Sequence, residues 1–334
     1  MKKTFAFIGA LAVTASATLV AQQINGAGAT FPGPIYTKWF SEYNKLHKDV
    51  QINYQPLGSG AGVQQITAKT VFFGASDMPM KDAQLAAAPG KILHFPTVLG
   101  GVVPIYNIPG VTQDLKFTGP VLADIYLGKI TKWNDPQIAK LNEGVTLPAA
   151  DIAVVHRSEG SGTTFIWCDF LSKVSPDFKS RVGADSSVNW PVGVGQKGSD
   201  GVSGQVKQTP GSIGYVELIY ASQNKISYGS VENASKKFIK ASFDSVTAAA
   251  AGATMPPDFR VSITNAPGPD AYPLSSFTWM LLYQESPDKT QGKAMVDFMR
   301  WALTDGEKFA KDLGYAPLPK NVIDMEMKAL DTIK

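Results

Sequence analysis

HRSEGSGTT, residues 156–164, is the stretch around which the rest of the chain is organised. The apolar, β-branched run at residues 151–155 before it indicates a buried strand, and the apolar run at 165–171 after it indicates a helix. A strand, a small-residue turn and a helix N-terminus together form an anion site. The first N–H groups of a helix lack intrahelical partners, and the aligned peptide dipoles place partial positive charge there.

The side chains of this stretch suit an oxyanion. Arg157 offers a planar fork of donors, Ser161 and Thr163 add hydroxyl groups, and Gly162 lets an anion approach the main chain. Glu159, two residues beyond Arg157, is placed to hold the guanidinium. Gly-Ser-Gly also marks ordinary turns, and Ser and Thr are common N-caps, so this motif alone leaves both interpretations open.

Three further junctions follow the same plan. A Gly/Ala-rich strand near residues 24–29 leads through Thr30 and Phe31 to a proline-started helix, and Ser59 lies in a glycine turn between the strand 50–54 and a second helix. The apolar strand near 72–76 ends at Asp77, which by itself is well placed to cap the following helix. Several turns suited to close backbone approach indicate one shared anion.

Composition sets the broad class of the protein. The chain has 334 residues and 44% apolar residues, which predicts two domains of ordinary size. Residues 1–21 have the charge and apolar pattern of a secretory leader, with cleavage expected after Ala21. Removing two lysines and no acids lowers the net charge from +3 to +1, which argues against nucleic acid as a partner. Cys168 is the only cysteine, so no intrachain disulfide is possible.

The motifs of catalysis are missing. The three histidines lie far apart, at 47, 94 and 156, and predict no metal site, and no Walker sequence or Gly-x-Ser-x-Gly turn is present. We expect neither a metal nor a cofactor. The chain offers several ways to hold an oxyanion and no evident way to transform one, which favours binding over catalysis.

A long apolar run at residues 93–106 is interrupted by glycine and proline. Because a single strand of that length is uncommon, we interpret the run as a segment that crosses between two domains.

Five motifs make the chain resemble the periplasmic phosphate-binding proteins of bacterial phosphate-specific ABC transporters over nearly its whole length. They are GAGATFP at 26–32, FGASD at 73–77, DIYLG at 124–128, GSGT at 160–163 and PGSIGYV at 210–216. The resemblance implies a type II-like periplasmic-binding-protein fold of two α/β lobes, with a ligand cleft between them and a two-strand crossover hinge. It places residues 22–97 and 275–334 in the first lobe and 98–274 in the second.

The resemblance also implies function: a periplasmic monomer that is not an enzyme binds inorganic phosphate and delivers it to the membrane permease subunits of an ABC importer. The implied phosphate ligands are Thr30, Phe31, Ser59, Asp77, Arg157, Ser161, Gly162 and Thr163, with Glu159 supporting Arg157. Two departures from the family pattern are Gly60, where a second Ser is frequent, and Glu159, where Asp is common. The alternatives are a binder of another tetrahedral oxyanion and a secreted phosphate-handling enzyme.

Asp77 has a specific expected role. A carboxylate beside a bound anion is unfavourable unless the ligand brings a proton. Phosphate near neutral pH carries a P–OH group that can donate to the carboxylate, whereas sulfate carries none. We therefore expect Asp77 to accept the phosphate proton and to exclude sulfate.

Overall fold

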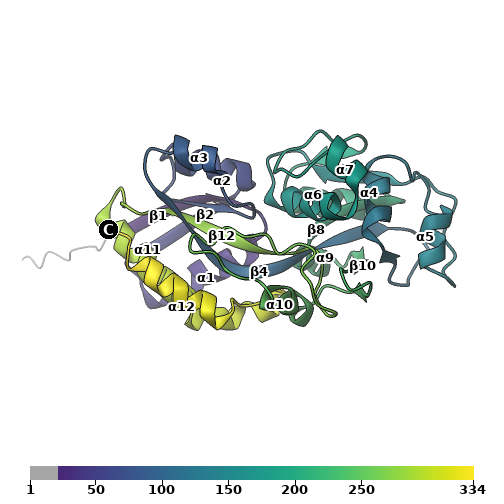
Figure 1. Cartoon of the computed structure of the whole chain (residues 1–334). Coiled ribbons are helices and arrows are strands. Elements are labelled where there is room, and N and C mark those ends of the chain that lie inside the picture. Colours follow the sequence, from purple (N-terminus) through teal and green to yellow (C-terminus); the bar gives the residue numbers. More distant parts are fainter. Residues whose placement is uncertain (1–21) are drawn as a thin grey trace, which may run out of the picture.

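The computed structural model describes residues 22–334 as two mixed α/β lobes that lie side by side (Figure 1). The predicted leader and its cleavage after Ala21 fall outside the described residues. Across residues 22–334, no helix has both the length and the apolar character needed to span a membrane.

One nine-stranded sheet runs through both lobes in the order β2-β1-β3-β12-β4-β8-β6-β7, and β9 also pairs with β4. Its strands are β1 (Gln22–Gly28), β2 (Val50–Pro56), β3 (Phe73–Ser76), β4 (Ile92–Asn107), β6 (Ala153–Arg157), β7 (Val194–Gln196), β8 (Ser212–Glu217), β9 (Ser227–Tyr228) and β12 (Ser275–Tyr283). Because β12 lies between β3 and β4, the C-terminal part of the chain completes the first lobe.

Strand β4 connects the lobes. Its residues from Ile92 to Gly101 pair antiparallel with β12, and those from Val102 to Asn107 pair antiparallel with β8. The run at 93–106 therefore crosses between lobes as predicted, but our expectation that it would not form one strand was wrong. Gly100 does not interrupt the strand: a Cβ there would lie 2.5 Å from the ring of Phe31, so this glycine makes room for an aromatic side chain.

A second segment crosses beside β4. Ser275 at the start of β12 is paired with Gly101, and the backbone N–H of Val102 donates to the carbonyl of Leu274 at 2.9 Å. The lobes are thus joined by two adjacent extended segments, which form the crossover hinge.

Figure 1 shows helices on both sides of the sheet of the first lobe, with α2 and α3 on one side and α1, α11 and α12 on the other. These helices are α1 (Gly33–Leu46), α2 (Ser59–Thr67), α3 (Asp82–Ala87), α11 (Lys289–Ala302) and α12 (Lys320–Leu330), with 3₁₀ turns η1 (Asp305–Phe309) and η2 (Lys311–Leu313). Helix α1 starts after Pro32, with Pro34 in its first turn, where a missing N–H costs nothing. Its buried Phe40 packs against Phe298 of α11, with ring centroids 5.1 Å apart.

The second lobe is built around the parallel strands β6 and β8. Its helices are α4 (Gly119–Tyr126), α5 (Pro136–Leu141), α6 (Gly162–Val174), α7 (Pro176–Arg181), α8 (Gly198–Gln208), α9 (Leu218–Asn224) and α10 (Phe243–Ala251). A small second sheet has the order β11 (Phe238–Ile239), β10 (Ser230–Glu232) and β5 (Lys116–Phe117). Trp167 of α6 stacks on Tyr215 of β8 at 5.1 Å between ring centroids, which fixes α6 against the sheet.

Candidate functional site

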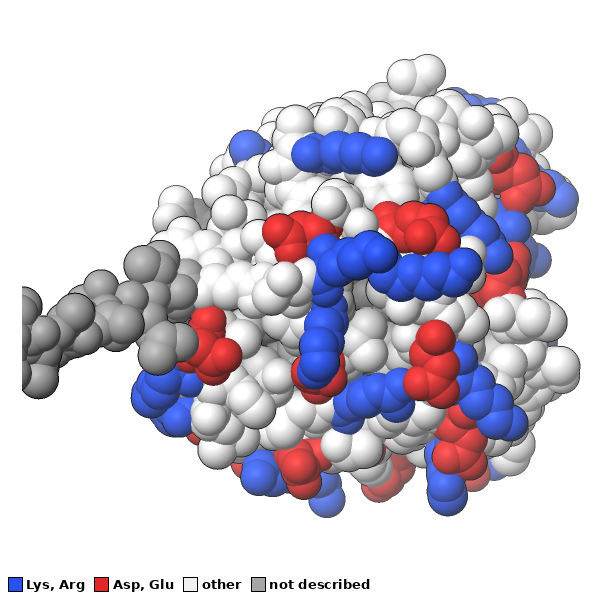
Figure 2. Space-filling model, turned by 90° about the vertical axis from the view of Figure 1, so that its left-hand side faces the viewer, with Lys and Arg blue, Asp and Glu red and all other residues white. Residues whose placement is uncertain are grey.

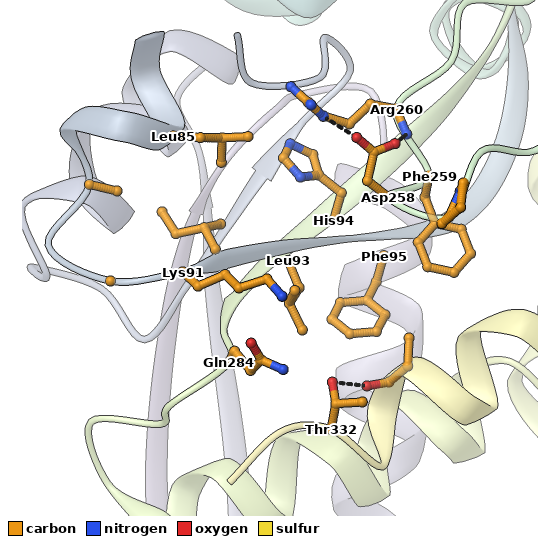
Figure 3. A pocket seen from close by; sticks show the side chains of 15 residues that line it. Leu85, Lys91, Leu93, His94, Phe95, Asp258, Phe259, Arg260, Gln284 and Thr332 are labelled. Carbon is orange, nitrogen blue, oxygen red and sulfur yellow. Dashed lines mark hydrogen bonds and ion pairs between the residues drawn. The ribbon is translucent and has the colours of Figure 1, made fainter. Parts of the chain in front are cut away.

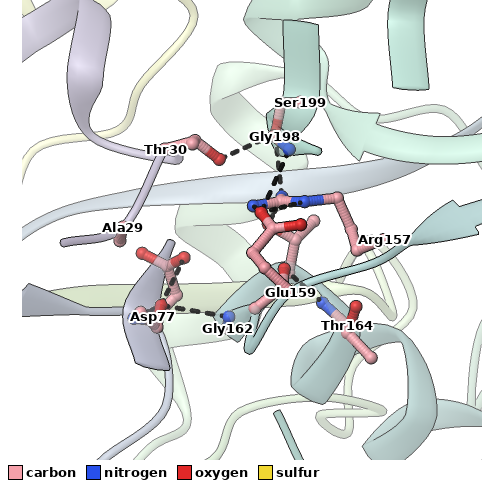
Figure 4. A network of polar contacts seen from close by, with 12 residues as sticks. Ala29, Thr30, Asp77, Arg157, Glu159, Gly162, Thr164, Gly198 and Ser199 are labelled. Atoms are coloured by element: carbon pink, nitrogen blue, oxygen red, sulfur yellow. Dashed lines mark hydrogen bonds and ion pairs between the residues drawn. The ribbon is translucent and has the colours of Figure 1, made fainter. Parts of the chain in front are cut away.

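The predicted site residues lie at strand ends and helix starts that meet between the lobes (Figure 4). In the first lobe, Thr30 and Phe31 lie between β1 and α1, Ser59 is the first residue of α2, and Asp77 directly follows β3. In the second lobe, Arg157 ends β6, Ser161 caps α6, and Gly162 and Thr163 are its first two residues. All eight are buried. The structure therefore brings together every residue of the predicted ligand set.

Asp77 is held by hydroxyl groups and does not cap a helix. Thr278 Oγ1 donates to its Oδ1 at 2.7 Å, and Ser59 Oγ donates to its Oδ2 at 3.3 Å. Helix α3 begins at Asp82 with Lys81 as its N-cap residue, so the helix-cap interpretation of Asp77 was wrong. The reason is that Pro79 follows Asp77 after one residue and disfavours a helix there, so α3 starts only at Asp82.

Burial, and then the negative charge of Glu217, raise the pKa of Asp77 from 3.8 to about 8. Hydrogen bonding from Thr278, the charge of Arg157 and hydrogen bonding from Ser59 oppose this rise without cancelling it. Asp77 therefore keeps its proton at neutral pH when no ligand is bound, and the site can exchange a proton with an anion that carries one.

Arg157 is fixed from two sides. Its Nε donates to Glu159 Oε1 at 2.8 Å, and Nη2 donates to the same oxygen. The backbone N–H of Gly198 also donates to Glu159 Oε1, at 3.0 Å. Burial by itself would raise the pKa of Glu159, but the hydrogen bond and charge of Arg157 outweigh it and the pKa is lowered. Glu159 therefore contacts the guanidinium of Arg157, as predicted from the sequence.

The sequence did not predict three polar residues of this network, which are Ser199, Glu217 and Thr278. Arg157 Nη1 donates to Thr163 Oγ1 at 3.1 Å and to Ser199 Oγ at 3.2 Å, and both hydroxyl groups donate to Glu217. Ser199 follows Gly198 at the start of α8, so the Gly-Ser pair before a helix was an available signal. Glu217 ends the apolar strand β8, where an acid is unusual, whereas Thr278 lies inside β12 and offered no signal.

The two lobes touch at the site. The backbone N–H of Gly60 donates to the carbonyl of Gly160 at 2.9 Å, and the N–H of Gly162 donates to Ser59 Oγ at 3.0 Å. Thr30 Oγ1 lies 3.0 Å from Ser199 Oγ. A Cβ at Gly60 would lie 3.1 Å from Gly160 Cα, so the glycine that departs from the family pattern stands at a direct contact between the lobes.

A cavity of about 570 Å³ lies away from the candidate site, between β4 of the first lobe and the segment 257–260 (Figure 3). Leu93, Phe95 and Phe259 give it an apolar lining, and its Arg260 is paired with Asp258 at 2.9 Å. It contains none of the predicted site residues. An apolar lining with internally paired charges does not suit a small tetrahedral anion.

Charges on the surface are mixed. On the face shown in Figure 2, acidic side chains lie beside the basic ones. Many ion pairs join helix neighbours, such as Lys293 with Asp297 at 2.6 Å and Lys320 with Asp324 at 2.9 Å. Within residues 22–334, no group of three or more His, Cys, Asp or Glu side chains is arranged to hold a metal ion.

The sequence of this chain is similar to those of known proteins along most of its length. Residues 12–305 match the model of the PBP superfamily domain. The phosphate-binding protein PstS of Pasteurella multocida is 47% identical over 97% of this chain and 94% of its own length. The protein of the same name from Xylella fastidiosa strain 9a5c is 46% identical over 90% of this chain and 83% of its own length. This chain belongs to the PstS family of phosphate-binding proteins.

Solved structures agree on the fold of the family. The crystal structure of a phosphate-binding protein from Stenotrophomonas maltophilia matches with a TM-score of 0.74 at 20% identity, over 92% of this chain and 94% of that one. At this identity the likeness concerns the two-lobe architecture.

Proposed function

We propose that this protein binds inorganic phosphate between its lobes and delivers it to the membrane permease of an ABC importer. The observation that carries the proposal is the buried junction of Asp77 with Ser59 in the first lobe and Arg157 with Thr163 in the second, in a chain 47% identical to a phosphate-binding protein. Phosphate needs both acceptors and donors, because it carries a P–OH group as well as anionic oxygens. The site supplies both kinds.

Backbone groups provide much of the attraction. Arg157 is the only Lys or Arg side chain within the described network, and Asp77, Glu159 and Glu217 surround it with acids. Side-chain charge therefore does not neutralise a dianion. Helices α1, α2 and α6 begin at the junction, and the dipoles of their N-termini supply positive potential there without a net charge.

We infer that the eight predicted residues are the phosphate ligands and that Glu159 orients Arg157. In this arrangement Thr30, Phe31 and Ser59 donate from the first lobe, and Arg157, Ser161, Gly162 and Thr163 donate from the second. Above about pH 8, where Asp77 is ionised, it accepts a hydrogen bond from the P–OH group. Sulfate offers the ionised carboxylate no proton, and this is the basis of discrimination at that pH.

We propose the lobe division that the sequence predicts, with residues 22–97 and 275–334 in the first lobe and 98–274 in the second. The change of partner along β4, between Gly101 and Val102, lies shortly after the predicted boundary at Thr97. The leader at residues 1–21 sends the protein to the periplasm, where it acts as a monomer and as a carrier without catalysis of its own.

Titration calorimetry against phosphate and sulfate, combined with a phosphatase assay on the purified protein, tests the proposal. We expect tight phosphate binding, much weaker sulfate binding at pH 9, and no turnover of a phosphate ester. Equal binding of the two anions would identify a general oxyanion binder. Ester turnover that copurifies with the protein would identify an enzyme.

A further inference from the structure

Glu217 is a buried acid at the second-lobe side of the phosphate site. It is the last residue of β8, and only 1% of its surface is exposed. Its Oε1 accepts a hydrogen bond from Thr163 Oγ1 at 2.5 Å, and its Oε2 accepts one from Ser199 Oγ at 2.7 Å. Unlike Glu159, it has no direct hydrogen bond with Arg157 among the described residues and reaches the guanidinium through these two hydroxyl groups.

The partners of the two hydroxyl groups fix where their protons point. Arg157 Nη1 lies 3.1 Å from Thr163 Oγ1 and 3.2 Å from Ser199 Oγ, and a guanidinium can only donate. Each hydroxyl group therefore accepts from Arg157 and has one proton left, which goes to Glu217. By the same argument, Thr30 Oγ1, at 3.0 Å from Ser199 Oγ, donates to that oxygen.

We propose that Glu217 is an internal competitor of the bound anion, holding the hydroxyl protons of Thr163 and Ser199 that phosphate would otherwise receive. The inference rests on the phosphate site proposed above, in which Thr163 is a ligand. A phosphate oxygen at the N-terminus of α6 obtains the Thr163 proton only if that hydroxyl group turns away from Glu217. Glu217 thus weakens phosphate binding and speeds phosphate release, so the site can give up its ligand for delivery.

Turning the Thr163 hydroxyl group away from Glu217 costs free energy. A buried carboxylate that loses a hydrogen bond keeps its desolvation penalty without compensation. It also repels the incoming anion. Glu217 already acts electrostatically on the opposite lobe, because its charge contributes to the raised pKa of Asp77.

The test is Glu217→Gln, with phosphate affinity measured by calorimetry and the dissociation rate by stopped-flow release. Gln has nearly the same shape, but its NH₂ group donates and therefore turns one hydroxyl proton toward the cleft. We expect phosphate to bind about tenfold or more tightly and to leave more slowly, since a hydrogen bond to a charged group is at stake. Unchanged or weaker binding by the folded variant would overturn the proposal.

Glu159→Gln is the matched control, because it removes the same charge from the other acid near Arg157. Glu159 accepts from Arg157 and from the N–H of Gly198, and no ligand hydroxyl group donates to it. We therefore expect weaker phosphate binding from this variant. An equal gain in affinity from both variants would show that general repulsion, rather than competition for hydroxyl protons, is responsible.

The wild-type protein provides a second test that does not depend on a variant folding. In a crystal structure with phosphate bound, we expect Thr163 Oγ1 to donate to phosphate and no longer to Glu217. Persistence of both bonds to Glu217 in the complex would refute the competition. Failure of the phosphate site itself would be seen separately, as full phosphate affinity in Arg157→Ala.

Discussion

Asp77 is a buried acid in a candidate anion site, where a negative charge would repel the ligand. It is an acid with 1% of its surface exposed, and its hydrogen-bond partners, Ser59 and Thr278, are neutral hydroxyl groups. Burial places its pKa at about 8, so protonation of this one group decides whether the first lobe presents a donor or an acceptor to the ligand. Phosphate can meet either form, because it carries both a proton and free oxygens. Sulfate can meet only the protonated form.

Replacing Asp77 by Asn should relax discrimination between the anions. At pH 9 wild-type Asp77 is ionised, and a site built around one specific hydrogen bond rejects an anion without the proton by about 10⁴-fold. The amide of Asn can turn its NH₂ group toward sulfate and removes the repelling charge. The quantity to measure is the ratio of sulfate to phosphate dissociation constants at pH 9, by calorimetry. A ratio that stays at its wild-type value would assign selectivity to other residues.

Sulfate binding to the wild-type protein should depend on pH. The folded-state pKa of Asp77 is raised to about 8, so the protonated donor form predominates below that pH and is lost above it. Apparent sulfate affinity should level off below pH 8 and fall about tenfold for each pH unit above it. Calorimetric titrations from pH 6 to 10 measure this, with Asp77→Asn as the control that should show no such slope. A wild-type profile that is flat across the range would be inconsistent with a role for Asp77 protonation.

The residues of the candidate site that could be predicted are those that lie in recognisable local sequence motifs. Gly162 and Thr163 lie in a turn whose composition itself indicates a helix N-terminus, and Arg157 precedes that turn. Ser199 and Glu217 reach the site only because α8 and β8 pack beside β6, which is a tertiary arrangement that no short motif encodes. Asp77 shows the same limit: its position between strand and proline suited a cap, and only the fold shows which groups bond to it.

At the scale of elements, the crossing strand was predicted in position but not in form. Glycine and proline within residues 93–106 argued against one continuous strand, since both weaken strands in isolation. In the structure β4 has β12 and then β8 as partners along its length, so tertiary pairing outweighs local preference. Helices α1 and α11 each bury one apolar stripe against the sheet or each other.

Helix α12 contains a buried acid that has no hydrogen-bond partner among the described residues. Glu326 has no exposed surface, and neither of its carboxylate oxygens has a hydrogen-bond partner within the described residues. Burial, and then the charge of Glu307 in η1, raise its pKa well above 4.5. Burial also raises the pKa of Glu307 to about 7. At these two groups the folded state therefore holds more protons than the unfolded chain above pH 4.5, and their contribution to the free energy of unfolding should fall as pH rises through 7.

Glu326→Gln should remove part of that dependence. We expect the variant to melt about 2 °C or more above the wild type at pH 8, where the acid is costly, and close to it at pH 5, where the acid is neutral. Calorimetric melting curves at the two pH values test this, and Glu143→Gln at an exposed position is the control. A difference from wild type that is the same at both pH values would show that ionisation of Glu326 does not govern stability.

At the scale of the whole molecule, the two lobes are closed on each other. Direct hydrogen bonds join the lobes at several points, including Tyr220 to the carbonyl of Thr30 at 2.8 Å, and Lys81 pairs with Asp185 at 2.5 Å. The lobes are also connected by the two extended segments at Gly101–Val102 and Leu274–Ser275, and Phe31 of the candidate site packs against the neighbouring Gly100. Two adjacent segments allow rotation of the lobes about one axis.

Closure on phosphate should be blocked by a side chain added at a direct contact between the lobes. In Gly60→Leu the Cβ would lie 3.1 Å from Gly160 Cα, and the atoms beyond it cannot fit while the lobes are closed. Small-angle scattering should show the radius of gyration of the wild type falling when phosphate is added, and little change in Gly60→Leu. Since binding would then require a disfavoured conformation, phosphate affinity should fall about tenfold or more. Gly204→Leu is the matched control, because this helical glycine of α8 has no atom within 4 Å of a built Cβ, and it should close and bind as the wild type does. If Gly60→Leu closes as fully as Gly204→Leu and binds phosphate as tightly, the approach of Gly60 to Gly160 is not part of the closing motion.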